Sequence, residues 1–136
     1  MKNVPYFVML SLLLLAACGE GSGSPGSEPI SALAPVPAEY VDKTNPFEPG
    51  AAEEGEKIFR TNCETCHGPQ GHGDGPAGDS LDPRPKNLAD LQKIAADDYL
   101  FWRISAGKAG TSMVAWKGIL TEEQIWQVLS FIRTLQ

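Results

Sequence analysis

Residues 63–67 read Cys63-Glu64-Thr65-Cys66-His67, and this short stretch decides how the rest of the chain is interpreted. Two cysteines three positions apart lie within one turn of a helix, and a histidine follows directly. The C-x-x-C-H pattern is typical of c-type haem attachment. Its two thiols reach the two vinyl groups of one porphyrin, and the histidine lies under the iron as an axial ligand. The motif therefore predicts one covalent haem c held by Cys63, Cys66 and His67.

Two other kinds of site use the same side chains. A C-x-x-C redox dithiol would need a surrounding βαβ pattern, and none is visible in the sequence. A zinc site would find the right ligand types in Cys63, Cys66, His67 and His72, but all four lie close together rather than in two separated pairs. Haem attachment is therefore favoured, and we interpret His72 as an exposed loop histidine without a redox role.

The segments on either side of the motif indicate helices. The helix-forming stretches are residues 51–62, a stretch from Asp97-Asp98 to Gly107, and a C-terminal stretch that begins at the Thr121/Gln124 pair. The two aspartates are expected to cap the second helix, and Thr121 with Gln124 forms a capping box. No stretch alternates with period two, so the sequence predicts an all-α domain with long loops.

The second axial position of the iron decides what such a haem can do. Met1 and Met9 lie in an apolar N-terminal segment that is expected to be removed, so Met113 is the only methionine of the mature chain. A lone methionine is usually a core residue. Here, however, His72 lies too close to His67 to reach the opposite haem face. The sequence therefore predicts His67 and Met113 as the two iron ligands, an arrangement suited to electron transfer.

From about residue 50 to the C-terminus the chain resembles the class I monohaem cytochromes c. The family has a glycine and an aromatic residue before the haem motif, matched by Gly55 and Phe59. An aliphatic and an aromatic residue of the C-terminal helix meet that pair, and Val128 and Phe131 match them. The resemblance implies a class I cytochrome c fold, with about four to five short helices and long loops around one covalently bound haem c.

The same resemblance implies the surroundings of the haem. The segment around Met113 is similar to the methionine loop of the family, although Val114 stands where proline is more common. The implied walls of the haem pocket are Leu88, Leu100, Ile104 and Trp116. Arg84 has two interpretations, a partner of a haem propionate or a solvated loop arginine. Trp102 is likewise either a core residue or a propionate donor.

The N-terminus is typical of an exported protein. Lys2 precedes an apolar run, residues 4–15, which is too short to span a hydrocarbon core of ~30 Å. Leu15-Ala16-Ala17-Cys18 resembles the bacterial lipobox, in which the cysteine is lipidated and becomes the N-terminus. An ordinary signal peptide is the alternative. We expect residues 1–17 to be removed and the chain to be anchored by lipid at Cys18, in the periplasm or on the outer face of a membrane.

Between the anchor and the domain lies a segment rich in glycine and proline. Residues 18–49 have little apolar periodicity, so they are expected to form a tether rather than to fold alone. The favoured interpretation is a plain solvated spacer. The alternative is that the stretches 36–40 and 45–47 lie along a partner subunit, because aromatic residues in a proline-rich strap suit docking. The domain proper is expected at residues 50–136.

Length and charge exclude several classes of function. A chain of 136 residues does not accommodate a large multidomain enzyme. Residues 50–136 carry 12 acidic and 9 basic side chains, a net charge of −3, which excludes a nucleic-acid-binding surface as the main function. No arrangement of nucleophile, base and orienting group is visible, so the chain is not expected to be an enzyme in its own right.

These observations predict a membrane-tethered one-electron carrier of a respiratory or photosynthetic electron-transfer chain, whose partners are redox proteins. The layout of lipobox, proline-rich strap and single haem domain is similar to the lipid-anchored monohaem cytochrome c subunit of alternative complex III, a bacterial quinol:acceptor oxidoreductase. Three alternatives remain open: an independent lipid-anchored cytochrome c shuttle, a haem-based sensor or enzyme with a labile Met113, and a structural subunit whose haem mainly stabilises the fold.

Overall fold

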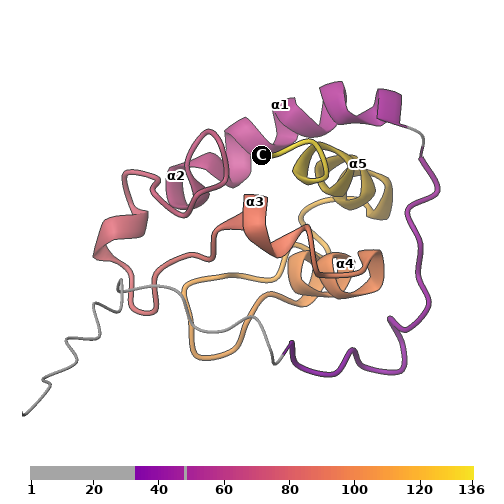
Figure 1. Ribbon diagram of the computed structural model, residues 1–136. Helices are drawn as coiled ribbons and strands as arrows, with labels where there is room; N and C mark the ends of the chain where they lie inside the picture. Colours follow the sequence, from indigo (N-terminus) through magenta and orange to yellow (C-terminus); the bar gives the residue numbers. More distant parts are fainter. Residues whose placement is uncertain (1–32, 48) are drawn as a thin grey trace, which may run out of the picture.

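The computed structural model describes residues 33–47 and 49–136, and the expected signal peptide and Cys18 lie outside these ranges. Its helices are the 3₁₀-helix η1 (Pro49–Ala51), α1 (Ala52–Asn62), α2 (Glu64–His67), the 3₁₀-helix η2 (Gly78–Ser80), α3 (Leu88–Leu91), α4 (Asp97–Ala106) and α5 (Glu122–Ile132). The described residues contain no strand, only an isolated bridge between Lys117 and Leu120. The prediction of an all-α domain is confirmed (Figure 1).

The central feature of the fold is the crossing of α1 and α5 (Figure 1). At the crossing, a Cβ atom on Gly55 would lie 1.8 Å from the backbone oxygen of Gln127, so only glycine allows this close approach. Phe59 is fully buried, and its ring centroid lies 5.1 Å from that of Phe131. Val128, which lies on α5 like Phe131, is also buried. The expected contact between the Gly55/Phe59 pair and α5 is thus present.

Helix α5 begins with the predicted capping box. The Thr121 hydroxyl accepts a bond from the Gln124 amide at 3.2 Å, and the Gln124 side-chain oxygen accepts one from the Thr121 amide at 2.9 Å. The expected cap of α4 was wrong in detail. Its N-cap is Ala96, which makes no side-chain cap. Asp97 and Asp98 lie inside the first turn, and their carboxylates accept hydrogen bonds from the amides of Asn45 and Asp42.

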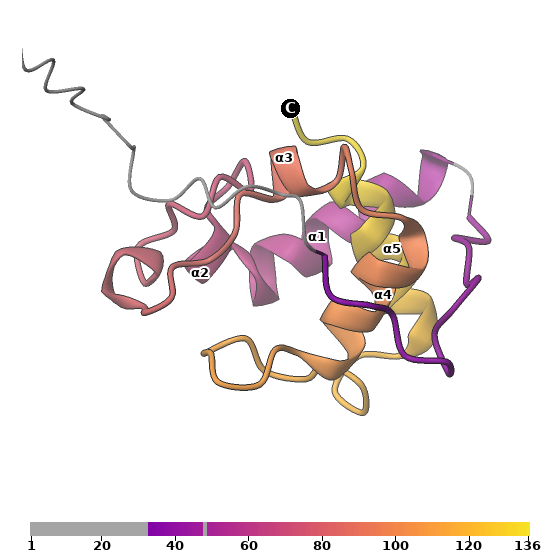
Figure 2. The same ribbon diagram turned by 60° about the horizontal axis from the view of Figure 1, so that its bottom comes forward.

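Residues 33–47, here called the strap, pack against their own domain. Tyr40 is only 8% exposed and lies 6.2 Å from Phe101 of α4, measured between ring centroids. Leu33, Val36 and Phe47 pack, partly buried, on the same core. Figures 1 and 2 both show the strap running past α4 and α5 to the start of α1. A plain solvated spacer is therefore the wrong interpretation for this stretch, because its apolar side chains are withdrawn from water into the domain.

None of the helices in the described ranges combines the length and the apolar content needed to cross a membrane. The two longest, α1 and α5, have 11 residues each.

Candidate haem site

The motif lies where α1 passes into α2. Cys63 ends α1, and the amides of Cys66 and His67 both donate to its carbonyl, at 3.1 and 2.9 Å. This single turn presents both thiols and the imidazole from adjacent positions. Cys63 and Cys66 are free cysteines, each half-buried. The turn therefore supplies two unpaired thiols beside one histidine, which is the donor set that covalent haem attachment requires.

The imidazole of His67 is held by one backbone contact. Its Nδ1 lies 3.3 Å from the carbonyl oxygen of Lys86, and since a carbonyl only accepts, Nδ1 carries the proton. Burial lowers the pKa of His67 below its ordinary value, and the hydrogen bond to Lys86 opposes this only in part. The ring is therefore neutral near pH 7 and keeps Nε2 for a metal, which fits an axial haem ligand.

The two rival interpretations of the motif find no support in this geometry. Burial, with a smaller effect from the neighbouring Cys66, raises the pKa of Cys63 to about 12, whereas reactive dithiols have a lowered pKa. Among the residues that the structure describes, no three His, Cys, Asp or Glu side chains gather as a metal cluster. His72 is exposed, and its Nε2 lies 3.2 Å from the backbone oxygen of Gln136. The interpretation of His72 as an exposed loop histidine is thus confirmed.

The loop after α2 folds back over the motif. The last carbonyls of α2 have no partner within the helix, and loop amides satisfy them. The bonds run from Ala77 to Thr65, from Gly75 to Cys66 and from Gly73 to His67, at 2.9, 3.3 and 2.8 Å. The amide of Leu88 then donates to the carbonyl of Gly71 at 2.6 Å. These bonds tie the following segment to the loop and bring the Lys86 carbonyl to His67.

The loop that carries Met113 is built on the C-terminal end of α4. The amides of Trp116 and Lys117 donate to the carbonyls of Ile104 and Ser105, at 3.1 and 3.0 Å. These carbonyls belong to the last turn of α4 and would otherwise lack partners. The loop is therefore fixed to the helix by backbone bonds.

Further bonds fix the methionine itself. The carbonyl of Met113 accepts from the Lys108 amide at 3.0 Å, and its amide donates to the Thr111 hydroxyl at 3.2 Å. Gly107 ends α4 at φ +67°, and a Cβ there would lie 2.5 Å from the Met113 carbonyl oxygen. Val114, which replaces the proline more common in the family, is 55% exposed. The loop around Met113 is thus ordered by backbone and side-chain hydrogen bonds.

The other residues singled out from the sequence have varied surroundings. Leu88, Leu100 and Ile104 are buried, and Trp116 is half-buried against the core. The guanidinium of Arg84 pairs with Asp79 on the surface, a partner that no sequence pattern indicated. Trp102 packs, half-buried, against the core, and the guanidinium carbon of Arg103 lies 3.8 Å from its ring centroid. This arrangement places Trp102 at the edge of the core.

Free thiols on one turn and a neutral imidazole with Nε2 available form a candidate c-type haem site on an all-α fold. The family model described as cytochrome C oxidase, cbb3-type, subunit III matches residues 50–132, so the chain belongs to this family of c-type cytochrome domains. Membership implies a covalently bound haem c.

Two curated relatives are subunits of cbb3-type oxidases. The chain is 32% identical over 92 residues to the cbb3-type cytochrome c oxidase subunit FixPc of Rhizobium leguminosarum bv. viciae, covering 66% of this chain and 30% of the relative. It is 33% identical over 103 residues to FixP of Azorhizobium caulinodans, covering 72% and 33%. The chain therefore spans about a third of the length of these relatives.

A solved structure shows the same fold. A chain of the Kuenenia stuttgartiensis reducing HAO-like protein complex Kustc0457/Kustc0458 superposes with a TM-score of 0.58 at 23% identity, covering 67% of this chain and 47% of that one. Together with the family match, this likeness identifies the fold as that of a class I cytochrome c, as predicted.

Proposed function

We propose that this protein is a one-electron carrier with a single haem c, bound through Cys63 and Cys66 and ligated by His67 and Met113. The main support is the His67 ring, which is neutral, oriented by the Lys86 carbonyl and left with Nε2 as a ligand atom. A His/Met-ligated haem c supplies reversible one-electron transfer. The chain then only has to hold the group, keep water from the iron and meet its partners.

Two further residues have roles in this proposal. Trp116 would form part of the pocket wall, since it is half-buried on the loop that carries Met113. Arg84 would leave its surface partner Asp79 and bind the carboxylate of a haem propionate. A guanidinium suits this role because it recognises carboxylates by paired hydrogen bonds.

The ligand assignment is tested on the haem-loaded chain and two variants. We expect the oxidised protein to show a methionine-to-iron charge-transfer band and the reduced protein not to bind carbon monoxide. Met113→Ala removes the sulfur ligand, so the band should vanish and carbon monoxide should bind. Val114→Ala, which changes an exposed neighbour, should behave like the original chain. Rapid binding of carbon monoxide by the original chain would favour the alternative function, a small-ligand sensor or enzyme with a labile Met113.

We propose further that lipid on Cys18 anchors the carrier to a membrane, outside the cytoplasm, within a respiratory assembly such as alternative complex III. The lipobox supports the anchor, and the layout of the chain supports the assembly. Two relatives are named as oxidase subunits, which supports the proposal that the partners of this chain are redox proteins.

Two measurements test this setting. Mass spectrometry of the mature chain should find lipid on Cys18 as the N-terminal residue, and an unmodified Cys18 would contradict the anchor. Purification in mild detergent should recover the chain with multihaem and membrane subunits. Recovery of a lone monomer would instead support the alternative of an independent lipid-anchored shuttle.

A further inference from the structure

The strap lies outside the residues that match the family, yet it is part of the folded domain. A turn directs it inward, because the amides of Tyr40 and Val41 both donate to the Pro37 carbonyl, at 2.8 and 3.2 Å. The turn buries Tyr40 beside Phe101. The strap is thus held near its middle by Tyr40, which packs against Phe101 of α4.

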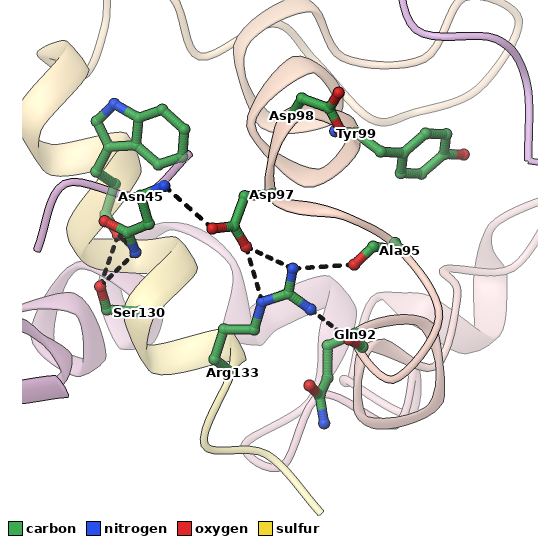
Figure 3. A network of polar contacts seen from close by, with 9 residues as sticks. Asn45, Gln92, Ala95, Asp97, Asp98, Tyr99, Ser130 and Arg133 are labelled. Atoms are coloured by element: carbon green, nitrogen blue, oxygen red, sulfur yellow. Dashed lines mark hydrogen bonds and ion pairs between the residues drawn. The ribbon is translucent and has the colours of Figure 1, made fainter. Parts of the chain in front are cut away.

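Asn45 adds a polar attachment through its backbone amide and its side-chain amide (Figure 3). Its backbone amide donates to Oδ2 of Asp97 at 3.0 Å. Its side-chain amide donates to the Ser130 hydroxyl at 2.8 Å and to the Trp126 carbonyl at 3.3 Å. Its Oδ1 accepts from the Phe47 amide at 3.1 Å. One residue of the strap therefore joins the first turn of α4 to the last two turns of α5.

The acceptor Asp97 is itself fixed by Arg133 at the end of α5 (Figure 3). The same guanidinium donates to the carbonyls of Gln92 and Ala95, in the segment before α4. Two weaker contacts lie nearer the middle of the strap. The Asp42 amide donates to Asp98 at 3.2 Å. Lys43 lies 3.6 Å from the Glu122 carboxylate and 5.4 Å from the centroid of the Phe101 ring.

The attachment of the strap limits the distance between Cys18 and the folded domain. Residues 19–32 lie between Cys18 and Leu33, and a chain of that length spans at most roughly 50 Å. With the strap released, residues 19–48 would lie between Cys18 and the start of η1 at Pro49, and a chain of that length spans at most roughly 105 Å. Packing of the strap thus halves the maximal reach.

We infer that residues 33–47 are an intramolecular clasp that sets how far the domain can move from its anchor. The clasp itself follows from the contacts of Tyr40 and Asn45. Its effect on reach rests on the proposed lipid at Cys18. A clasped carrier meets partners close to the membrane surface, and a released one reaches about twice as far.

Hydrogen exchange of the haem-loaded chain tests the clasp. The amides of Asp42 and Asn45 should exchange at least tenfold more slowly than in an unstructured peptide. Asn45→Ala should accelerate exchange across the strap at least tenfold and leave α1 and α5 protected. The matched control is Thr44→Ala, at the exposed neighbouring position, and should have no effect.

Peptide-like exchange of the strap in the original chain would overturn the clasp, as would equal behaviour of the two variants. If Asn45→Ala also accelerates exchange in α1 and α5, the variant has disturbed the whole domain, and Asp98→Ala is used in its place. Among the contacts of the strap, Asp98→Ala removes only the acceptor of the Asp42 amide. It should accelerate exchange at Asp42, and unchanged exchange there would overturn the clasp.

Neutron reflectometry of the mature chain on a supported bilayer tests the reach. A variant with Tyr40→Ala and Asn45→Ala should form a protein layer that extends further from the bilayer, by at most the roughly 55 Å that the released strap adds to the chain between Cys18 and the domain. An unchanged layer would overturn the effect on reach. If mass spectrometry finds no lipid on Cys18, the proposed anchor is wrong, and so is the effect of the clasp on reach. Hydrogen exchange still tests whether the strap is packed on the domain.

Discussion

Arg133 shows what a single side chain contributes to the fold. Its guanidinium donates to the carbonyls of Gln92 and Ala95 and pairs with the Asp97 carboxylate, and its side chain is 30% exposed. A planar fork with several donors suits three acceptors at once, which a lysine ammonium would not match. Arg133 therefore connects the end of α5 to the segment between α3 and α4.

Arg133→Ala should lower the free energy of unfolding by about 2–3 kcal/mol, because it leaves Oδ1 of the partly buried Asp97 carboxylate and two carbonyls without donors. Urea denaturation of the haem-loaded chain measures the change. Lys93→Ala removes an exposed pair with Asp90 and should cost no more than about 0.5 kcal/mol. Equal losses in the two variants would show that the Arg133 contacts are not stabilising.

The two arginines Arg84 and Arg133 also show how far single residues can be predicted. Arg84 follows the haem motif in the sequence, and the resemblance to the cytochromes c implies that it can bind a haem propionate. Arg133 was not singled out, because its acceptors are far away in sequence and two of them are backbone carbonyls. Every residue has such a carbonyl, so no sequence pattern marks these two. The Lys86 carbonyl beside His67 was missed for the same reason.

At the scale of elements, the crossing of α1 and α5 depends on the absence of a side chain at Gly55. Gly55→Ala places a Cβ against the backbone of Gln127, so the helices must separate. We expect a loss of about 3 kcal/mol or more in the free energy of unfolding, measured by denaturation of the haem-loaded chain. Gly50→Ala, where nothing lies within 4 Å of the added Cβ, should be close to neutral. A neutral Gly55→Ala would contradict the close contact.

The capping box of α5 gives a smaller effect. Thr121→Ala removes the acceptor of the Gln124 amide and should cost about 1 kcal/mol. The matched control is Thr61→Ala in α1, whose hydroxyl only bonds back to the Lys57 carbonyl within the helix. Thermal melts of the two variants should therefore differ, with the lower melting temperature for Thr121→Ala. Identical melts would mean that the box does not stabilise α5.

Periodicity explains which elements the sequence could predict. Helices α1, α4 and α5 have 10 or 11 residues each, long enough for an apolar stripe to be recognised. Helix α3 has four residues and depends on the cap of Asn87, whose side chain accepts from the Asp90 amide. The strap has no periodicity at all. Its packing relies on Tyr40 and Asn45, and isolated residues of this kind are indistinguishable from those of a spacer.

At the scale of the whole molecule, the folded unit begins before residue 50. A chain that starts at Pro49 should be less stable than one that starts at Leu33 by about 3 kcal/mol, because it loses the burial of Tyr40 and the hydrogen bonds of Asn45. For a domain of this size, the melting temperature should fall by roughly 10–20 °C. Calorimetry of the two haem-loaded chains measures this difference. Equal melting temperatures would show that the strap adds nothing to stability.

The strap also has a mechanical consequence. A pull on the N-terminal segment acts first on the packing of Leu33 and Val36 on the core and then on the contacts of Tyr40 and Asn45, before any force reaches α1. The contacts of Tyr40 and Asn45 are made with α4 and α5, and not with the turn that carries Cys63 and Cys66. A mechanical force on the anchored domain would therefore stretch the clasp before it strained the turn that attaches the haem.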